Sequence, residues 1–247
     1  MSAVTAPGDD LPATDPQVLR ARARTYDLLA ACLDGDVDVL AGAIEDGDFA
    51  RLSAALPVDL APDFDENPDR DALAVGYDNL FVVPGPHYVP PFASAHATDP
   101  SADYESDSAY HAGDAGGELL GDPAEAVARL YTAAGFEPTR GDAIPDHVAA
   151  VFEFLAALAA TEADRREAGR REDADGLRQL QRLALDRLGW LDTFHEQVRE
   201  ADSVEGTFAR LVGVARTFAA WDARAGVGAA DEPEPTAAVD SRHDSHE

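Results

Sequence analysis

The sequence contains no lysine: all 19 of its basic residues are arginines, against 48 acidic residues, and the formal net charge is −29. A surface this negative repels the phosphates of nucleic acids and the headgroups of anionic membranes, so neither is an expected partner. In about 1 M salt the screening length falls to roughly 3 Å, which damps the repulsion between neighbouring carboxylates. The composition therefore favours a halophilic protein, adapted to a cytoplasm rich in salt.

Cysteine, strand patterns and long apolar runs are also scarce. The single cysteine, Cys32, lies in an apolar stretch, and a buried thiol is expected there. No uncharged run approaches the length of a membrane span, and the first sixteen residues lack the basic and apolar regions of a secretory signal. We expect a soluble, cytoplasmic protein without stable membrane insertion. Short β-like runs occur only at 81–83 and 88–89, and prolines interrupt them.

Hydrophobic residues make up 45% of the chain, enough to bury a sizeable core. Apolar side chains recur at three-and-four spacing in most segments, which predicts an all-α, single-domain helical bundle. The predicted helices cover about 16–34, 37–44, 49–56, 69–81, 122–135, a segment opening at Pro145, 173–200 and 203–225. Around them we expect a disordered N-terminus (1–15), an all-helical domain (16–225) with a long loop or hinge (82–117), and a disordered acidic tail (226–247).

Motifs for catalysis and metal binding are weak. The chain has no glycine-rich phosphate loop and no Gly-x-Ser-x-Gly elbow. His87, His96 and His111 fall in the long loop without the one-turn spacing that directs two imidazoles at one ion. We therefore predict no catalytic residue, no metal and no cofactor. Two alternatives stay open: a metal-dependent or hydrolytic enzyme that uses these histidines, in one version with Ser94, and a helical adaptor whose acidic tail binds partners. His195 falls on an apolar stripe and should face the core or a groove.

The first segment that stands out is aromatic and rich in proline. It begins with Tyr77, Phe81 and Pro84, where a predicted helix stops abruptly, and continues through residues 90–94 as Pro-Pro-Phe-Ala-Ser. A strip of this kind is rigid and apolar, as a peptide-binding groove requires. A structured hinge that packs on the bundle explains the same pattern equally well.

The second segment is Pro145-Asp146-His147, at the start of a predicted helix. Asp146 can accept hydrogen bonds from the first helix amides, which is a structural role. Glu153 follows seven residues later and returns to the same helix face. In a functional interpretation, Asp146, Glu153 and His147 form an acidic lip that receives the arginines of a ligand peptide beside an apolar wall.

Together the two segments resemble the signature of the TorD/DmsD/NarJ family of molybdoenzyme maturation chaperones. In that family a Tyr-x-x-Leu-Phe-x-x-Pro stretch leads to a Pro-Pro-Tyr-Glu-Ser-like segment, and a Pro-Asp-His motif opens a helix that continues as Glu-Phe-Leu-x-x-Leu. The matching residues here are Tyr77, Leu80, Phe81, Pro84, Pro90, Pro91, Phe92, Ser94, Pro145, Asp146, His147, Glu153, Phe154, Leu155 and Leu158. The departure is Phe92-Ala93 in place of Tyr-Glu, which removes a hydroxyl and a carboxylate.

The resemblance implies a function as well as a fold. The protein would be a cytoplasmic chaperone rather than an enzyme, acting as a monomer or homodimer. It would bind the apo catalytic subunit of a molybdopterin oxidoreductase, such as a DMSO, TMAO or nitrate reductase, together with its twin-arginine leader peptide, until the cofactor is inserted. By the same resemblance the client-binding residues would be Pro145, Asp146, His147, Glu153, Tyr77, Phe81, Pro84, Pro91, Phe92 and Ser94.

Overall fold

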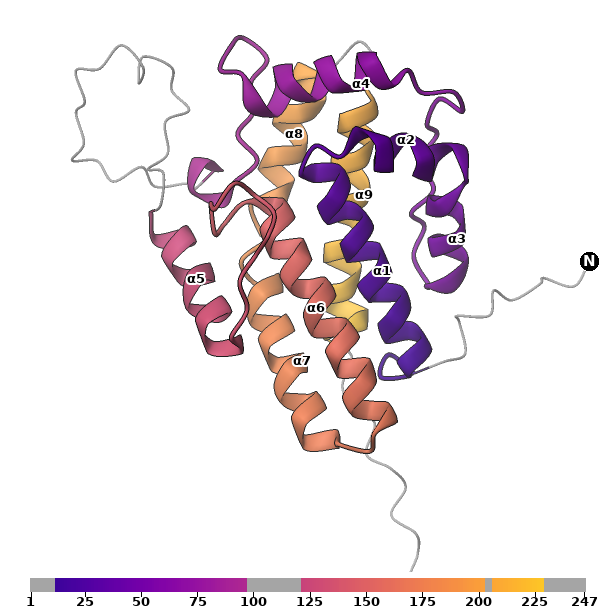
Figure 1. The fold of residues 1–247 in the computed structure, drawn as a ribbon, viewed down its shortest axis with the longest axis vertical. Helices are drawn as coiled ribbons and strands as arrows, with labels where there is room; N and C mark the ends of the chain where they lie inside the picture. The colour runs from indigo at the N-terminus through magenta and orange to yellow at the C-terminus, as the bar shows by residue number, and fades with distance from the viewer. Residues whose placement is uncertain (1–11, 97–120, 203–205, 229–247) are drawn as a thin grey trace, which may run out of the picture.

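The computed structural model describes residues 12–96, 121–202 and 206–228. The predicted disordered termini and the predicted loop at 82–117 lie wholly or partly outside these ranges, as does His111. Within the described ranges every regular element is a helix (Figure 1), which confirms the all-α prediction. The one β-type contact there is an isolated bridge between Phe92 and His147. None of the helices described combines the length and apolarity needed to cross a membrane.

The long helices form a bundle and the shorter ones cover its ends and sides. In chain order the elements are α1 (Pro16–Leu33), α2 (Val37–Glu45), α3 (Asp48–Ala55), α4 (Arg70–Tyr77), the π turn η1 (Asp78–Val82), the 3-10 turn η2 (Ala93–His96), α5 (Asp122–Ala134), α6 (Val148–Glu167), α7 (Arg171–Leu185), α8 (Leu191–Ala201), α9 (Thr207–Trp221) and the π turn η4 (Asp222–Gly226). Figure 1 shows α1 and α6 side by side, with the α8 and α9 pair behind them.

Helix α6 is the centre of the bundle. Its buried residues cover most of the helix circumference, and only a narrow stripe that includes Glu153, Thr161 and Asp164 is partly open to water. It packs most extensively against α1 and next against α7. Helix α1 begins as its sequence predicts, because Pro16 occupies the first turn and the Asp15 carboxylate accepts the Gln17 amide hydrogen bond at 2.7 Å. Cys32 near its other end is buried, as expected.

The predicted helix at 173–200 is wrong as a single element, because the chain breaks into α7 and α8. Two tight turns separate them: the Leu188 amide bonds to the Leu185 carbonyl, and the Leu191 amide to the Leu188 carbonyl, each at 3.0 Å. Gly189 lies in the second of these turns and is the one glycine between α7 and α8. Leu188 and Leu191 are both buried in the same core, so the apolar spacing continues across the break and hides it.

Other boundaries differ because helices end in π turns or begin late. Helix α4 stops at Tyr77 and passes into η1, and α9 stops at Trp221 and passes into η4. The helix predicted to open at Pro145 begins at Val148 instead, after a turn.

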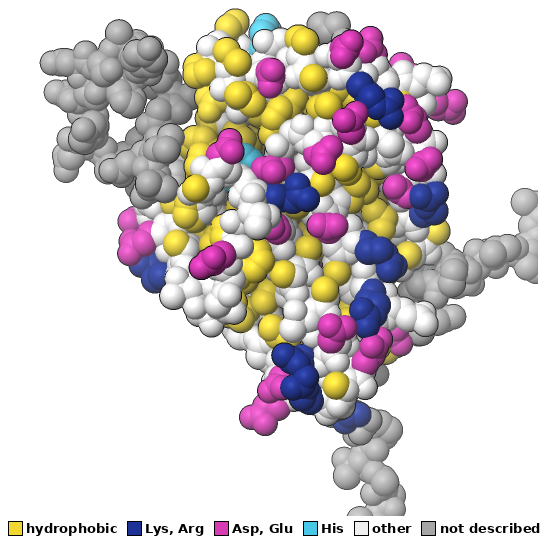
Figure 2. Space-filling model, in the orientation of Figure 1, with side chains coloured by type: hydrophobic (Ala, Val, Ile, Leu, Met, Phe, Trp, Pro, Cys, Tyr) yellow, Lys and Arg dark blue, Asp and Glu magenta, His cyan; other side chains and the backbone are white. Residues whose placement is uncertain are grey.

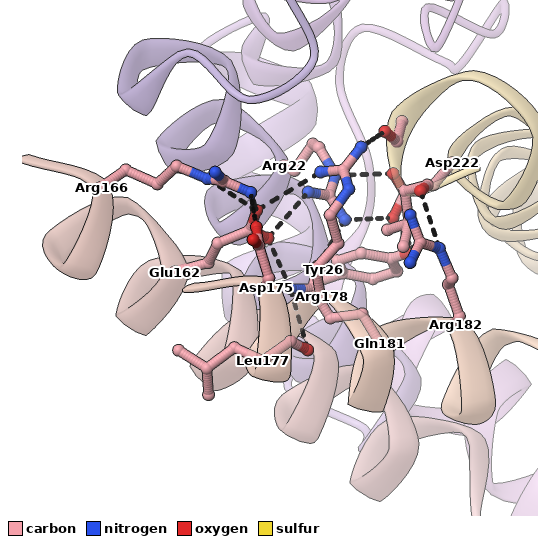
Figure 3. A network of polar contacts seen from close by, with 12 residues as sticks. Arg22, Tyr26, Glu162, Arg166, Asp175, Leu177, Arg178, Gln181, Arg182 and Asp222 are labelled. Atoms are coloured by element: carbon pink, nitrogen blue, oxygen red, sulfur yellow. Dashed lines mark hydrogen bonds and ion pairs between the residues drawn. The ribbon is translucent and has the colours of Figure 1, made fainter. Parts of the chain in front are cut away.

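A buried network of charged and polar side chains ties the bundle together (Figure 3). Arg22 of α1 donates two hydrogen bonds to the Asp222 carboxylate of η4, at 2.6 and 2.8 Å, and the Tyr26 hydroxyl donates a third at 2.7 Å. Arg22 also bonds to Gln181 of α7, whose amide donates to Glu162 of α6 at 2.7 Å. These five side chains have no exposed surface. Four separate elements are therefore joined through one desolvated cluster.

The charges in this network nearly cancel. A second arginine, Arg178, lies 3.4 Å from Glu162 and also donates to the Gly226 carbonyl. Two buried arginines thus face two buried carboxylates, which is the condition under which ions tolerate removal from water. Burial, reinforced by the charge of Asp222, raises the pKa of Tyr26 well above its usual value, so its hydroxyl stays a donor.

Breaking this network should cost far more than breaking a surface ion pair. Asp222→Ala leaves Arg22 charged and buried without its main partner, and we expect the free energy of unfolding to fall by about 3–5 kcal/mol. Asp192→Ala removes the exposed partner of Arg216 and should cost about 1 kcal/mol or less. Urea denaturation at fixed salt measures both. Equal effects of the two substitutions would refute the central role of the network.

Candidate functional site

The proline-rich segment and the start of α6 lie against each other, so the structure brings the two sequence motifs together. We use the term strip for residues 82–96. The Val148 amide donates to the Pro91 carbonyl at 2.9 Å, and the Ala93 amide donates to the Asp146 carbonyl at 3.1 Å. Pro91 and Phe92 are buried in this contact. The strip is therefore held by backbone pairing to the turn that precedes α6.

Asp146 fastens the strip a second time through its side chain. One carboxylate oxygen accepts the Ser94 amide at 2.7 Å and the Ser94 hydroxyl at 2.6 Å. Ser94 is buried and Asp146 has no exposed surface. We call this pair the Asp146–Ser94 latch. The prediction that Asp146 caps the helix is wrong, because its carboxylate faces the strip rather than the first amides of α6.

His147 caps α6 in place of Asp146. Its Nδ1 accepts the Ala149 amide at 3.1 Å. The chain passes so close that a Cβ on Gly141 would lie 2.7 Å from the His147 Cβ, and Gly141 also has a φ of +80°, so only glycine fits there. Burial lowers the pKa of His147 to about 4, and the nearby Asp142 charge only partly opposes this effect. His147 is therefore neutral at pH 7 and serves as a hydrogen-bond acceptor.

Glu153 and Pro145 hold the chain that leads into the latch. Glu153 accepts the amides of Thr139 and Arg140 at 2.9 and 3.1 Å, and the Thr139 hydroxyl as well. The half-buried Pro145 receives the Tyr131 hydroxyl on its carbonyl at 2.8 Å. The carboxylates of Asp146 and Glu153 are thus both engaged by neighbouring backbone amides, and the structure does not present them as a free acidic lip.

Tyr77 and Phe81 anchor the other end of the strip. The Tyr77 hydroxyl donates to the Leu33 carbonyl at the end of α1, at 3.1 Å, and its ring packs edge-on against Phe81. Phe81 is buried and contacts Phe208 with ring centroids 5.7 Å apart. Gly35, whose φ is +93°, leaves room for the Tyr77 ring, because a Cβ on residue 35 would lie only 2.6 Å from that ring. These aromatic residues fix the start of the strip to the bundle.

Only part of the strip reaches the surface, and that part is apolar. Val82 and Val83 are 54% and 53% exposed, Pro84 beside them is exposed, and Val75 of α4 is 61% exposed. Single exposed apolar side chains are common, but several exposed together are typical of an interaction surface. Figure 2 shows apolar side chains gathering over the upper left of the molecule, near α4 and the strip. We call these four residues the apolar patch.

Three aspartates lie close enough to Tyr77, which stands in sequence between Val75 and Val82 of the apolar patch, for their charges to act on it. Burial chiefly raises the pKa of Tyr77, and the negative charges of Asp34, Asp142 and Asp78 raise it further. They come from the end of α1, the turn before α6 and η1, so only the tertiary structure gathers them. We call them the acidic rim. Sequence analysis missed these residues, although Asp78 stands inside the Tyr77–Phe81 motif and could have been noticed.

The turn that carries Asp142 has an unusual backbone. Asp142 and Ala143 have φ values of 50° and 63°, directly after Gly141 at 80°. Left-handed conformations of residues other than glycine are uncommon, and alanine gains nothing from them. The turn is closed by the Ile144 amide on the Gly141 carbonyl at 2.8 Å, and the Gly141 amide bonds to Asp34 at 2.7 Å. These hydrogen bonds thus hold a strained backbone at Asp142, one of the three residues of the acidic rim.

The hydrolytic alternative requires a hydroxyl paired with a histidine. The Ser94 hydroxyl bonds instead to Asp146. His96 stacks on Trp190 with ring centroids 5.1 Å apart, and its Nε2 lies 2.7 Å from the Pro90 carbonyl oxygen. The structure therefore does not form a Ser94–His96 pair. Among the described residues, no three His, Cys, Asp or Glu side chains are grouped to hold a metal ion.

The buried, neutral His147 predicts a specific acid sensitivity. The folded protein disfavours its protonation, so its contribution to stability is complete above about pH 6.5 and is lost as the pH falls toward 4. His147→Asn keeps a capping acceptor but does not titrate. From pH 7 to pH 5 the variant should lose about 2 kcal/mol less unfolding free energy than the parent. Denaturant titrations at both pH values measure the difference.

The control for this experiment is the exposed His87 in the variant His87→Asn, which should keep the parent's pH dependence. If His147→Asn and the parent lost equal stability on acidification, the assignment of a buried neutral imidazole would be incorrect.

A comparison with known protein families finds one whose matched region contains both of the motifs that the structure brings together. The sequence model of one family, described as the nitrate reductase delta subunit, matches residues 45–196, which include the strip and the start of α6. Searches of curated proteins and of solved structures found no match. The family match covers more than half of the chain and confirms the resemblance noted in the sequence. The chain belongs to the nitrate reductase delta subunit family, whose members are chaperones for the maturation of molybdoenzymes.

Proposed function

We propose that this chain is a cytoplasmic, non-enzymatic chaperone for one molybdopterin oxidoreductase. It binds the apo catalytic subunit through the twin-arginine leader peptide and keeps it competent for cofactor insertion before export. A DMSO, TMAO or nitrate reductase is the client class. The domain at 16–225 carries this activity by itself, as a monomer or homodimer.

The observation that carries this proposal is an apolar patch next to an acidic rim. A twin-arginine leader has a cationic pair followed by a hydrophobic stretch, and these two surfaces offer one partner for each part. Val82, Val83 and Pro84 take the hydrophobic stretch, while Asp78 and Asp142 of the rim take the arginines. Asp34 contributes less, because its carboxylate already accepts the Gly141 amide.

In this mechanism the latch acts without touching the leader. Asp146 and Ser94 are buried, so they hold the strip in place and thereby fix the position of the apolar patch. Phe81, Pro91, Phe92 and His147 have the same indirect role. Pro84 is exposed, and Tyr77, Pro145 and Glu153 are partly exposed, so these family-motif residues are open to direct contact.

Substitutions on the two surfaces test this division of roles. Val82→Ser with Val83→Ser should weaken binding of a leader peptide about tenfold, because about 1.4 kcal/mol of apolar burial is lost. Asp78→Asn with Asp142→Asn should weaken it a few-fold in dilute salt, and asparagine also tolerates the left-handed backbone at 142. Calorimetric titration of the peptide measures both.

The matched control is Leu183→Ser, which changes a partly exposed apolar residue on α7 away from the strip. It should bind the leader as the parent does. The same variants apply to affinity capture of the tagged chain from a cell lysate. A molybdopterin oxidoreductase catalytic subunit should be captured by the parent and by Leu183→Ser, but not by the double valine variant. Equal capture by all three would reject the apolar patch as the client site.

Salt should have little influence on leader binding. At about 1 M salt the screening length is near 3 Å, so only arginines in direct contact with the acidic rim contribute, while apolar burial persists. We expect the affinity to fall by less than about tenfold, or 1.4 kcal/mol, between dilute and molar KCl. The loss in the Asp78→Asn, Asp142→Asn variant should be smaller at molar KCl, where only the direct contacts with the arginines remain. A steep decline with salt in the parent would contradict recognition through the hydrophobic stretch.

A further inference from the structure

A second concave surface lies apart from the strip, on the α8 and α9 pair. It is a groove of about 610 Å³ between these helices and the link that follows α3. Its apolar lining comes from Leu60, Ala61, Pro62, Ala209 and Val214. The surfaces assigned to the leader lie on α4, η1, the end of α1 and the turn before α6, so this groove is independent of the proposed function.

The groove is less negative than the chain as a whole. Three arginines line it, Arg199, Arg210 and Arg216, against two aspartates. Both aspartates are engaged locally: Asp202 accepts the Gly206 and Ala209 amides, at 3.2 and 2.9 Å, and Asp59 accepts the Ala61 amide. In a chain where acids outnumber arginines 48 to 19, a groove with this balance repels a negative ligand less than the rest of the surface does.

His195 lies close enough to Arg199 and Arg216 for their charges to act on it. It projects from α8 toward α9, where its Nε2 would lie 3.1 Å from a Cβ on Gly213. Burial lowers its pKa, and the charges of Arg216 and Arg199 lower it further, against a hydrogen bond to the Ala209 backbone and the charge of Asp192. Asp192, which pairs with Arg216, has a side chain that is 72% exposed. The guanidinium groups are thus close enough to the groove to act on a ligand within it.

We propose that this groove binds the acidic C-terminal segment of the chain itself, residues 229–247. That segment contains six acidic residues and one arginine, so its charge complements the groove. Arginine forks match carboxylates well, and the apolar lining accommodates the alanines and prolines between them. Docked in this way, the segment competes internally with any other acidic ligand of the groove.

The position of Gly228, the last residue described, allows this docking. The groove extends along α9 from Gly206 to Thr217, and the helix from Gly206 to Gly226 is about 30 Å long at 1.5 Å per residue. Ten extended residues span about 33 Å, so the segment can return along the whole groove. Because the segment is tethered, its effective concentration at the groove is in the millimolar range, and weak contacts suffice for occupancy.

Distance measurements on the full-length chain test the proposal. Nitroxide labels are placed at Glu196→Cys, exposed on α8, and at Ser241→Cys in the C-terminal segment. The native Cys32 does not interfere, because it is buried and burial raises its pKa to about 12. Pulsed electron resonance should then show a narrow distance distribution in dilute salt. It should broaden in Arg199→Gln with Arg216→Gln, and also in molar KCl, where contacts with exposed arginines are screened.

The matched control removes two exposed arginines elsewhere, Arg51→Gln on α3 and Arg129→Gln on α5, for the same change in total charge. It should keep the narrow distribution. A broad distribution in the parent, or equal broadening in the control, would overturn the proposal. Loss of the narrow distribution on dilution with unlabelled chain would also overturn it, because the segment would then occupy the groove of a second copy. Leader binding is measured separately, so failure here leaves the proposed function untouched.

Discussion

The buried pairing of Arg22 with Asp222 is the constraint on which the rest of the structure depends. It joins the first long helix to the π turn that follows the last one, and Glu162, Gln181 and Arg178 extend it through α6 and α7. Ions without access to water are stable only when every partner is in position. The network therefore demands one arrangement of the bundle, in which α6 is buried over most of its circumference.

A second buried carboxylate sets the geometry of the surface that we propose for the client. Asp146 holds Ser94, and through it the strip, against the turn before α6. With Tyr77 and Phe81 fastening the other end, the valines and proline between them are held outward. The residues that best mark the family are thus mostly internal supports, and the exposed surface beside them consists of less distinctive residues. Burial explains why a motif and a contact surface need not coincide.

Much of the fold follows from local sequence. The helical period, the Asp15–Pro16 start of α1 and the absence of strand patterns all predict the all-α bundle that the described residues form. The break between α7 and α8 escaped prediction because Leu188 and Leu191 keep the apolar spacing across it. The helix start at Val148 escaped for a different reason. Asp146 and His147 are both plausible N-caps of α6. The strip binds the Asp146 carboxylate, so His147 is the residue that caps the helix.

The sequence by itself determined the class of fold, the buried state of Cys32 and, through its two motifs, the family. These depend on periodicity and residue type, which are local properties. Tertiary structure alone decided that Asp146 forms the latch with Ser94, that Glu153 binds backbone amides, and that the charges of Asp34, Asp78 and Asp142 act on Tyr77. It also placed His195 in a groove lined by three arginines. The physical reason is that burial and electrostatic environment arise from segments distant in the chain, and no local pattern records which of them meet.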